Sequence, residues 1–331
     1  MKIAIVKLSA MGDIIHAMVA LQYLKQFKAS LQIDWIVEQG FAAVLEGNPH
    51  IDHILPVNLK MIKKDKMALF SQIRVLKEYA KNDYDLVIDA QGLIKSAVTA
   101  KFLGKNIAGF SKASIREGMA TYFYTHKVDI TYDANTIDRN VKVMSEPLGL
   151  EISKEMVLNK KAFLFYKDDA EIEQYLDSEK KNIIFVIGST WESRNYPKEK
   201  FTDIANSLKQ NVLIVWGSEA EKNSAEWIAA HSNYARVLPR IDLNLLKAII
   251  GKSDLLIGND TGPTHMAWGL NRPSITIFGP TPVSRVYETE INKVVKSKSH
   301  VDPFKLDKND FSIQEIDSAE IITMAKELLH A

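Results

Sequence analysis

Asp13 is the first residue whose type and position could serve catalysis. It lies in the string LSAMGDIIH, after an apolar run at Ile3–Leu8 that predicts a buried strand and before a helical pattern from Ile14 to Phe27. At a helix N-terminus, aspartate commonly caps free backbone N–H groups. The helix dipole there also favours an ionised carboxylate, which a general base must be. Asp13 could therefore be a helix cap, a general base, or both. The string lacks the GxGxxG spacing of a dinucleotide-binding site.

A second string, IGNDTGPTHMA at residues 257–267, has the character of an anion site. It follows an apolar strand pattern and opens a helical one. Thr261 and Gly262 would place free N–H groups at a helix N-terminus, where a diphosphate binds well. His265 can donate a hydrogen bond to a phosphate or a sugar. For Asp260 the alternative is a helix cap beside a packed histidine.

Two further strings carry polar residues after predicted strands. In GSTWESRNYP, residues 188–197, Ser189 and Thr190 supply hydroxyl donors, and Arg194 could pair with a phosphate in bidentate fashion. Glu221 follows the apolar run VLIVW, where nucleotide-binding folds place a carboxylate that binds the ribose. A solvated loop and an ordinary helix-surface glutamate are the alternatives.

A basic string, LKMIKKDK at residues 59–66, follows the third predicted strand. Lys60, Lys63 and Lys64 lie there with a single opposing acid, and Arg116 in SKASIREG is a similar candidate. Lysines in a loop beside a ligand site would attract an acidic substrate. The alternative is a solvated, functionally neutral surface.

The candidate residues described above lie between predicted strands and helices that alternate along the chain. Short apolar runs alternate with helical patterns in both halves of the chain, which predicts an α/β fold with two doubly wound parallel sheets. Ligands of such sheets bind at the carboxyl ends of the strands, so we expect the two domains to face a shared cleft. We place an N-terminal domain at 1–155, a C-terminal domain at 156–311 and a C-terminal helix at 312–331.

Composition narrows the class of protein. The 331 residues include no cysteine, which excludes disulfides, thiolate nucleophiles and cysteine-ligated metals. The formal net charge of +1 argues against a nucleic-acid binder. Residues 1–150 hold 19 Lys and Arg against 15 Asp and Glu, whereas the remainder holds 23 against 26. No apolar run has the length of a membrane span, and the first residues do not read as a signal peptide, so we expect a cytoplasmic protein.

Taken together, these strings resemble the ADP-heptose:lipopolysaccharide heptosyltransferases of glycosyltransferase family 9, most of all the members that add the first heptose of the inner core. The resemblance rests on VKLSAMGDIIH, IDWIVEQGF, VIDAQGLIKSA, NDTGPTHMA and ITIFGPT, in that order along nearly the whole chain. It implies a GT-B fold of two Rossmann-like domains and a C-terminal helix that packs back on the N-terminal domain. It also implies an inverting transfer of heptose from ADP-L-glycero-D-manno-heptose to Kdo of Kdo2-lipid A, with no metal and no cofactor.

The resemblance also assigns roles to residues. Asp13 matches the general base, and the acceptor side takes Lys60, Lys63, Lys64 and Arg116, with Met61 in place of an expected basic residue. The donor side takes Ser189, Thr190, Arg194, Glu221, Asp260, Thr261, Gly262 and His265, although threonine is expected at 189 and lysine at 194.

The resemblance further implies work at the cytoplasmic face of the inner membrane, and it leaves the oligomeric state open. Alternatives are transfer of the second heptose, an epimerase-like enzyme of the same architecture, and a nucleotide-binding protein without activity.

Overall fold

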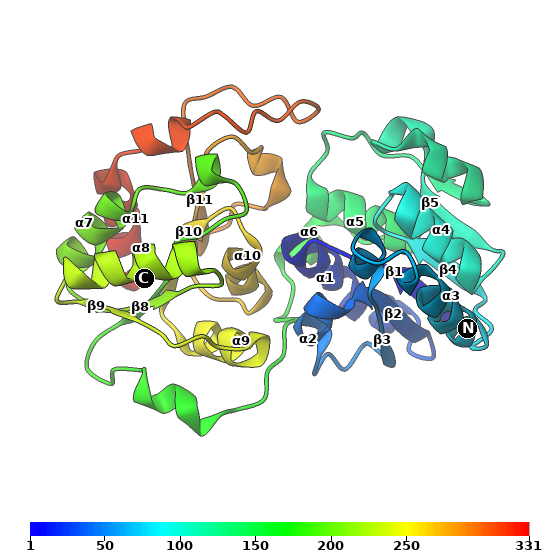
Figure 1. The fold of residues 1–331 in the computed structure, drawn as a ribbon, viewed down its shortest axis with the longest axis horizontal. Helices are drawn as coiled ribbons and strands as arrows, with labels where there is room; N and C mark the ends of the chain where they lie inside the picture. The colour runs from blue at the N-terminus through cyan, green and yellow to red at the C-terminus, as the bar shows by residue number, and fades with distance from the viewer. Residues whose placement is uncertain (331) are drawn as a thin grey trace. The chain divides into compact units, whose positions relative to one another are not determined.

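The computed structural model describes residues 1–330 as two compact units, Met1–Phe165 and a second unit that begins at Tyr166 (Figure 1). The boundary lies ten residues beyond the expected one. The intervening segment belongs to the first unit because the Tyr23 hydroxyl donates to the Met156 carbonyl, and the Asn48 amide donates to the Phe163 carbonyl at 3.1 Å. The buried ring of Phe163 completes this attachment.

The first unit contains a six-stranded parallel sheet in the order β3-β2-β1-β4-β5-β6. Its strands are β1 (Lys2–Val6), β2 (Gln32–Glu38), β3 (His53–Val57), β4 (Leu86–Asp89), β5 (Ile107–Phe110) and β6 (His126–Val128). Strand order reverses between β1 and β4, and this switch point is where doubly wound sheets bind ligands.

The second unit repeats this topology, with the order β12-β11-β10-β7-β8-β9. Its strands are β7 (Asn182–Val186), β8 (Asn211–Val215), β9 (Ala235–Val237), β10 (Leu255–Asn259), β11 (Ser274–Phe278) and β12 (Asn292–Lys296). The switch point therefore lies between β7 and β10. Both central strands are fully buried and read as continuous apolar runs, as strands covered on two faces do.

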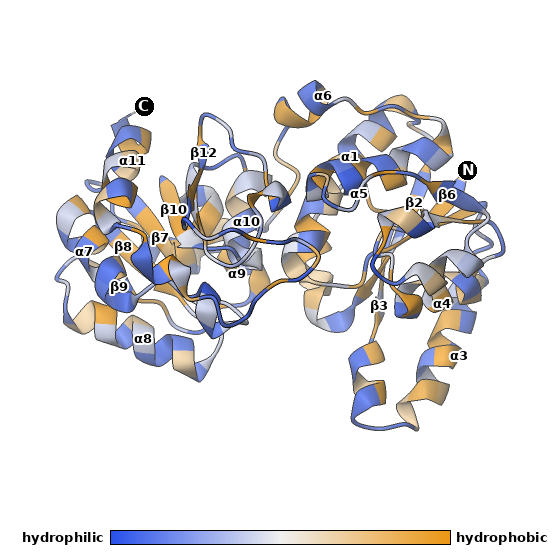
Figure 2. Cartoon of the chain, turned by 90° about the horizontal axis from the view of Figure 1, so that it is seen from above, coloured by the Kyte–Doolittle hydropathy of each residue, from blue (hydrophilic) through white to orange (hydrophobic). Residues whose placement is uncertain are grey.

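Helices connect the strands of each unit. Those of the first unit are α1 (Met11–Phe27), α2 (Ala42–Leu45), α3 (Ala68–Ala80), α4 (Ile94–Leu103), α5 (Thr136–Ser145) and α6 (Lys154–Leu158). Those of the second are α7 (Lys198–Leu208), α8 (Glu219–Ala230), α9 (Leu243–Lys252), α10 (Gly262–Gly269) and α11 (Ser318–His330). Figure 2 shows the apolar strands inside each unit and polar residues on the outer helix surfaces.

The C-terminal helix covers the sheet of its own unit. α11 packs against α7 and the strands of the second unit. Its side chains Ile321 and Ala325 are fully buried in that unit's core, together with Ile313 and Ile316 just before it. The apolar residues that predicted this helix from the sequence therefore pack on the sheet of the second unit. That this helix also packs back on the N-terminal domain stays a prediction.

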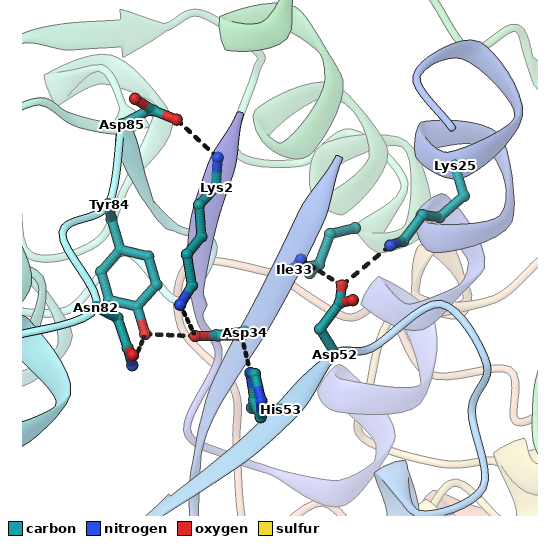
Figure 3. Close-up of polar contacts among 9 residues, drawn as sticks. All are labelled: Lys2, Lys25, Ile33, Asp34, Asp52, His53, Asn82, Tyr84 and Asp85. Carbon is teal, nitrogen blue, oxygen red and sulfur yellow. Dashed lines mark hydrogen bonds and ion pairs between the residues drawn. The ribbon is translucent and has the colours of Figure 1, made fainter. Parts of the chain in front are cut away.

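A polar network fixes the amino ends of the first sheet (Figure 3). The fully buried Asp34 carboxylate accepts from the Tyr84 hydroxyl at 2.8 Å and contacts His53 Nδ1 at 2.8 Å. Asp52 accepts from the Ile33 N–H at 2.7 Å and from Lys25 at 3.0 Å. Because these polar groups pair with one another, they stabilise the amino ends of the strands. We therefore look for ligand-binding groups at the carboxyl ends.

Candidate active site

Asp13 lies at the carboxyl edge of the first sheet, in the first turn of α1. The N-cap of α1 is Ala10, not Asp13, but the Asp13 carboxylate accepts a hydrogen bond from the Ala10 N–H at 3.3 Å. The preceding loop is held by Gln91, whose side-chain oxygen accepts from the N–H groups of Leu8 and Ser9, both at 3.1 Å. Asp13 is therefore the third residue of the helix, and the interpretation of Asp13 as the N-cap is wrong. Its carboxylate is half-exposed, which is compatible with the interpretation as a general base.

Lys7 is a buried cation that sequence reasoning missed. It follows β1, is 6% exposed, and its ammonium donates to the Ala90 carbonyl at 2.8 Å and to Asn140 Oδ1 at 2.9 Å. Burial lowers the pKa of Lys7, while the nearby charges of Asp13 and Asp89 oppose that shift. Its signal in the sequence is a charged residue inside an otherwise apolar strand pattern.

Asp89 ends β4 beside Lys7 and is fully buried. Its carboxylate accepts from the Tyr124 hydroxyl at 2.7 Å, from the Ser96 hydroxyl at 2.9 Å and from the N–H groups of the following turn. Burial raises the pKa of Asp89 more than these hydrogen bonds lower it. All of the hydrogen-bond donors around Asp89 are neutral, so this carboxylate organises the turn after β4.

The predicted basic residues lie on segments that leave the same edge of the sheet as the loop before Asp13. Lys60 lies in the 3₁₀ helix Leu59–Lys63 after β3, with its ammonium 4.6 Å from the centre of the Phe41 ring, and Lys63 and Lys64 are exposed beside it. Arg116 is exposed in the segment after β5. Both β3 and β5 lie two strands from β1, which corresponds to about 10 Å on each side. The segments that carry the predicted cations therefore follow strands on either side of β1, the strand that Asp13 follows.

Glu38, at the end of β2, supports the lysine segment. The side chain is 2% exposed, and burial raises the pKa of Glu38 against the opposing charges of Lys95 and Lys60. The backbone N–H groups of Lys60 and Leu59 also stabilise its charged form. Glu38 therefore ties the segment with the predicted acceptor lysines to the sheet edge.

In the second unit, Asp260 is the centre of a buried charged network. It directly follows β10, is 1% exposed, and contacts His265 Nε2 at 3.0 Å and Arg194 Nη2 at 3.3 Å. The Thr281 hydroxyl donates to it at 2.8 Å. Burial alone would raise the pKa of Asp260, but the hydrogen bond from His265 and the charges of Arg285, His265 and Arg194 hold that pKa well below its usual range. Asp260 therefore anchors the side chains predicted to face the donor.

The start of α10 lies where the sequence predicts an anion site. Thr261 is the N-cap and Gly262 is the first helical residue, so the Gly262 N–H has no acceptor within the helix. The first turn packs closely on the sheet, because a Cβ on Gly258 would lie 2.6 Å from the Thr264 hydroxyl oxygen. Thr261 and Gly262 are thus placed where the sequence predicted them, next to Asp260 and one turn from His265.

Glu221 lies between the loops after β7 and β8. Its carboxylate accepts from the Gly217 N–H at 2.6 Å and lies so close to Gly188 that a Cβ there would meet it at 2.1 Å. A cavity of about 570 Å³ opens at this carboxyl edge, lined by Gly188, Ser189 and Glu221 together with Lys198 and Gln314. This volume falls within the range of small-molecule sites.

Loop 188–195 holds buried polar atoms that a ligand could satisfy. The hydroxyls of Ser189 and Ser193 and the side-chain oxygen of Asn195 have no hydrogen-bond partner among residues 1–330. Such atoms are rare in native proteins and often mark a bound group. The predicted partner Thr190 is exposed in the same loop.

Asn259, which sequence reasoning missed, fixes this loop to the end of β10. Its side-chain N–H donates to the Ile187 carbonyl at 2.7 Å, and its oxygen accepts from the Tyr196 N–H at 3.1 Å. Asn259 is fully buried, so it positions the loop and does not face a ligand.

Other features of the structure bear on the class of site. Two further cavities, of about 420 and 700 Å³, lie beside the amino ends of β7 and β8, the edge that ligands of parallel sheets avoid. Among residues 1–330, no group of three His, Asp or Glu side chains is arranged to hold a metal ion. None of the described helices combines the length and the apolar character that crossing a bilayer requires.

Two Rossmann-ordered parallel sheets with polar sites at their carboxyl edges define an enzyme of the GT-B architecture. A family model described as glycosyltransferase family 9 (heptosyltransferase) matches residues 72–307. The chain is 37% identical to lipopolysaccharide heptosyltransferase 1 of Campylobacter coli, over 99% of both proteins. It is 30% identical to the protein of that name from Pseudomonas aeruginosa, over 85% of this chain and 79% of the other.

A solved structure of Escherichia coli heptosyltransferase WaaC with ADP-2-deoxy-2-fluoro heptose has the same fold, with a TM-score of 0.80 and 23% identity over 99% of both chains. The chain therefore belongs to glycosyltransferase family 9, the heptosyltransferases.

Proposed function

We propose that this heptosyltransferase transfers heptose from ADP-L-glycero-D-manno-heptose to Kdo of Kdo2-lipid A, with inversion at the anomeric carbon and without a metal ion. The observation that carries the donor assignment is the cavity at the carboxyl edge of the second sheet, with Glu221 and unsatisfied polar atoms of loop 188–195 around it. The similarity to proteins named heptosyltransferase 1 supports the choice of the first heptose over the second.

On the donor side, each group has a chemical task. Glu221 accepts hydrogen bonds from the ribose hydroxyls, as carboxylates after the second strand of nucleotide-binding sheets do. Ser189 and Thr190 donate to the diphosphate, which also meets the N–H groups at the start of α10. Arg194 supplies positive charge, and its ion pair with Asp260 holds the guanidinium in place. His265, fixed by the same carboxylate, donates to phosphate or heptose.

The reaction is one displacement. Asp13 removes the proton from a Kdo hydroxyl while that oxygen attacks the anomeric carbon of heptose. The bond between that carbon and the diphosphate oxygen breaks, and ADP leaves with the electron pair. Negative charge grows on the leaving diphosphate, so preorganised donors at Thr261, Gly262 and Arg194 lower the barrier. These groups take the part that a divalent cation has in other sugar-nucleotide enzymes.

On the acceptor side, the cations on either side of Asp13 bind the acidic groups of Kdo2-lipid A. Lys60, Lys63 and Lys64 lie on one side and Arg116 on the other. Because the acceptor is a lipid, the protein works at the cytoplasmic face of the inner membrane as a peripheral protein.

The test is acceptor-dependent release of ADP. ADP-heptose is incubated with the enzyme in the presence and absence of Kdo2-lipid A, and ADP and the glycolipid product are both measured. The expected result is release of ADP only with the acceptor, with one heptose added per ADP. An epimerase would convert the donor without an acceptor, and a binding protein would release no ADP; either outcome overturns the proposal.

A further inference from the structure

Exposed apolar side chains gather on the hairpin that follows β3. Met61, Met67, Leu69 and Phe70 are 42%, 69%, 43% and 67% exposed, and all four lie within ten residues. The hairpin consists of the 3₁₀ helix Leu59–Lys63 and α3, and Figure 2 shows it extending away from the sheet of the first unit. Large apolar side chains this exposed, and this close together, mark an interaction surface.

Hydrogen bonds hold the hairpin in this shape. At its base, the Asn58 N–H donates to the Gln72 side chain at 2.7 Å. At its tip, the Asp65 carboxylate accepts from the Met67 N–H at 2.8 Å, and the Asp65 N–H donates to the Met61 carbonyl at 2.8 Å. The tip is therefore a hydrogen-bonded turn, beside which the side chains of Met67 and Phe70 are exposed.

Neighbouring elements also expose apolar side chains. α3 packs against α4, and α4 packs against the 3₁₀ helix Gly118–Phe123. Four more large apolar side chains are exposed there: Ile94, Val98, Met119 and Tyr122. Basic residues accompany both parts of this surface, and they are Lys60, Lys63, Lys64, Lys66, Lys95 and Arg116. We call these apolar and basic residues together the tip face.

We propose that the tip face docks on an anionic membrane, with Met67 and Phe70 entering the headgroup region and the lysines pairing with lipid phosphates. Interfacial membrane binding combines buried apolar area with attraction to anionic lipid, and both are present here. A protein partner fits less well, because lysine is depleted from protein interfaces. The inference extends the proposed function, since the same face carries the lysines assigned to the lipid acceptor.

The full chain is tested by sedimentation with vesicles that contain no Kdo2-lipid A. One set mixes phosphatidylethanolamine with anionic phosphatidylglycerol, and the other is pure phosphatidylcholine. The double variant M67D/F70D should bind the anionic vesicles on the order of tenfold less than the unchanged protein. The matched control is F304D in the second unit, because Phe304 is 68% exposed and off the tip face; it should bind normally. Equal binding by all three proteins, or equal binding to both vesicle types, overturns the proposal.

A second measurement separates docking from the transferase function. With a deacylated, water-soluble Kdo acceptor, M67D/F70D should turn over like the unchanged enzyme, whereas with vesicle-embedded Kdo2-lipid A it should be slower. Equal loss of turnover on both acceptors would mean that these side chains serve the active site, and concentration-dependent dimerisation removed by M67D/F70D would mean that they bind a second copy. Either result overturns docking. Vesicle binding without any acceptor-dependent ADP release would overturn the proposed function alone.

Discussion

The two units bury an aspartate at equivalent places and use it differently. Asp89 ends β4 and Asp260 follows β10, and these are the fourth strands of two sheets with the same order. The hydrogen bonds to Asp89 come from neutral donors, and burial outweighs them and raises the pKa of Asp89. Cations surround Asp260, so its pKa is lowered despite equal burial. Identical topology therefore leaves the electrostatics of the switch point to a few neighbouring side chains.

This difference suits the two proposed tasks. A carboxylate ringed by neutral donors fixes the turn that carries Gln91, which in turn holds the loop before Asp13. A carboxylate ringed by Arg194 and His265 fixes cations and donors that can face an anionic ligand. The net charges of the units run the other way: 22 Lys and Arg against 17 Asp and Glu up to residue 165, and 20 against 24 beyond it. The net charge of a unit therefore does not predict the charge around its buried aspartate.

The largest expected effect is on catalysis by the first unit. Asp13→Asn removes the proposed base but keeps the shape and the position at the start of α1. Turnover should fall by about 10²–10⁴-fold, while the affinity for ADP, a property of the second unit, stays within about twofold. Steady-state kinetics and calorimetric titration with ADP measure the two. The exposed Asp129→Asn is the control, and near-normal turnover in Asp13→Asn would remove this residue from the mechanism.

The next effect separates the two buried aspartates. Asp260→Asn leaves Arg194 and His265 without their anion, which should cost about 3–5 kcal/mol of unfolding free energy. Asp89→Asn loses hydrogen bonds from neutral donors and the negative charge near Lys7, but Lys7 keeps its own hydrogen bonds, so the cost should be smaller, about 1–2 kcal/mol. Urea unfolding of both variants measures the difference. Equal losses would show that the charge of the neighbours does not matter.

The same pair should respond to pH with opposite signs. The folded-state pKa of Asp260 lies below its ordinary value of 3.8, so its contribution is present above pH 3.8 and is lost as the pH falls toward the folded value. The folded-state pKa of Asp89 lies above 3.8, so stability falls as the pH rises from 3.8 through the raised value. Each asparagine variant should flatten only its own part of the stability profile.

Sequence patterns predicted the central strands of both sheets, because these are buried on two faces and read as apolar runs. No apolar run of that kind marks the edge strands β6, β9 and β12, because they are short or carry charged residues. The family model and the solved structure confirm the α/β fold.

The site residues divide in a similar way. The sequence could place Asp13, Glu221 and the start of α10 at the carboxyl edges, because each comes shortly after a strand pattern; their roles stay predictions. Lys7 and Asn259 were missed, because a positioning residue is recognised by what it bonds to and not by its type. Asp260 also accepts a hydrogen bond from Thr281, which lies 21 residues further along the chain. A contact between residues this far apart cannot be predicted from a local sequence pattern.

A smaller effect tests the ribose assignment in the second unit. Glu221→Gln keeps the size of the side chain but removes its charge, so ribose hydroxyls lose an ionised acceptor. The affinity for ADP should fall about tenfold, with turnover at saturating donor nearly unchanged. Glu226→Gln on the same helix is the control, because that glutamate is exposed and pairs with Lys222 at 3.7 Å. Unchanged ADP affinity in Glu221→Gln would assign the cavity to another part of the ligand.

The smallest expected effect concerns the exposed cations of the first unit. Lys64→Glu reverses a charge at the carboxyl edge, so the KM for the anionic acceptor should rise about fivefold at low salt. The control is Lys105→Glu, an identical charge change just before β5, at the amino edge of the same sheet, which should leave that KM unchanged. Because exposed charges are screened, the difference between the two variants should shrink as the ionic strength rises above about 0.15 M. If both variants raise the KM equally, net charge and not the placement of Lys64 attracts the acceptor.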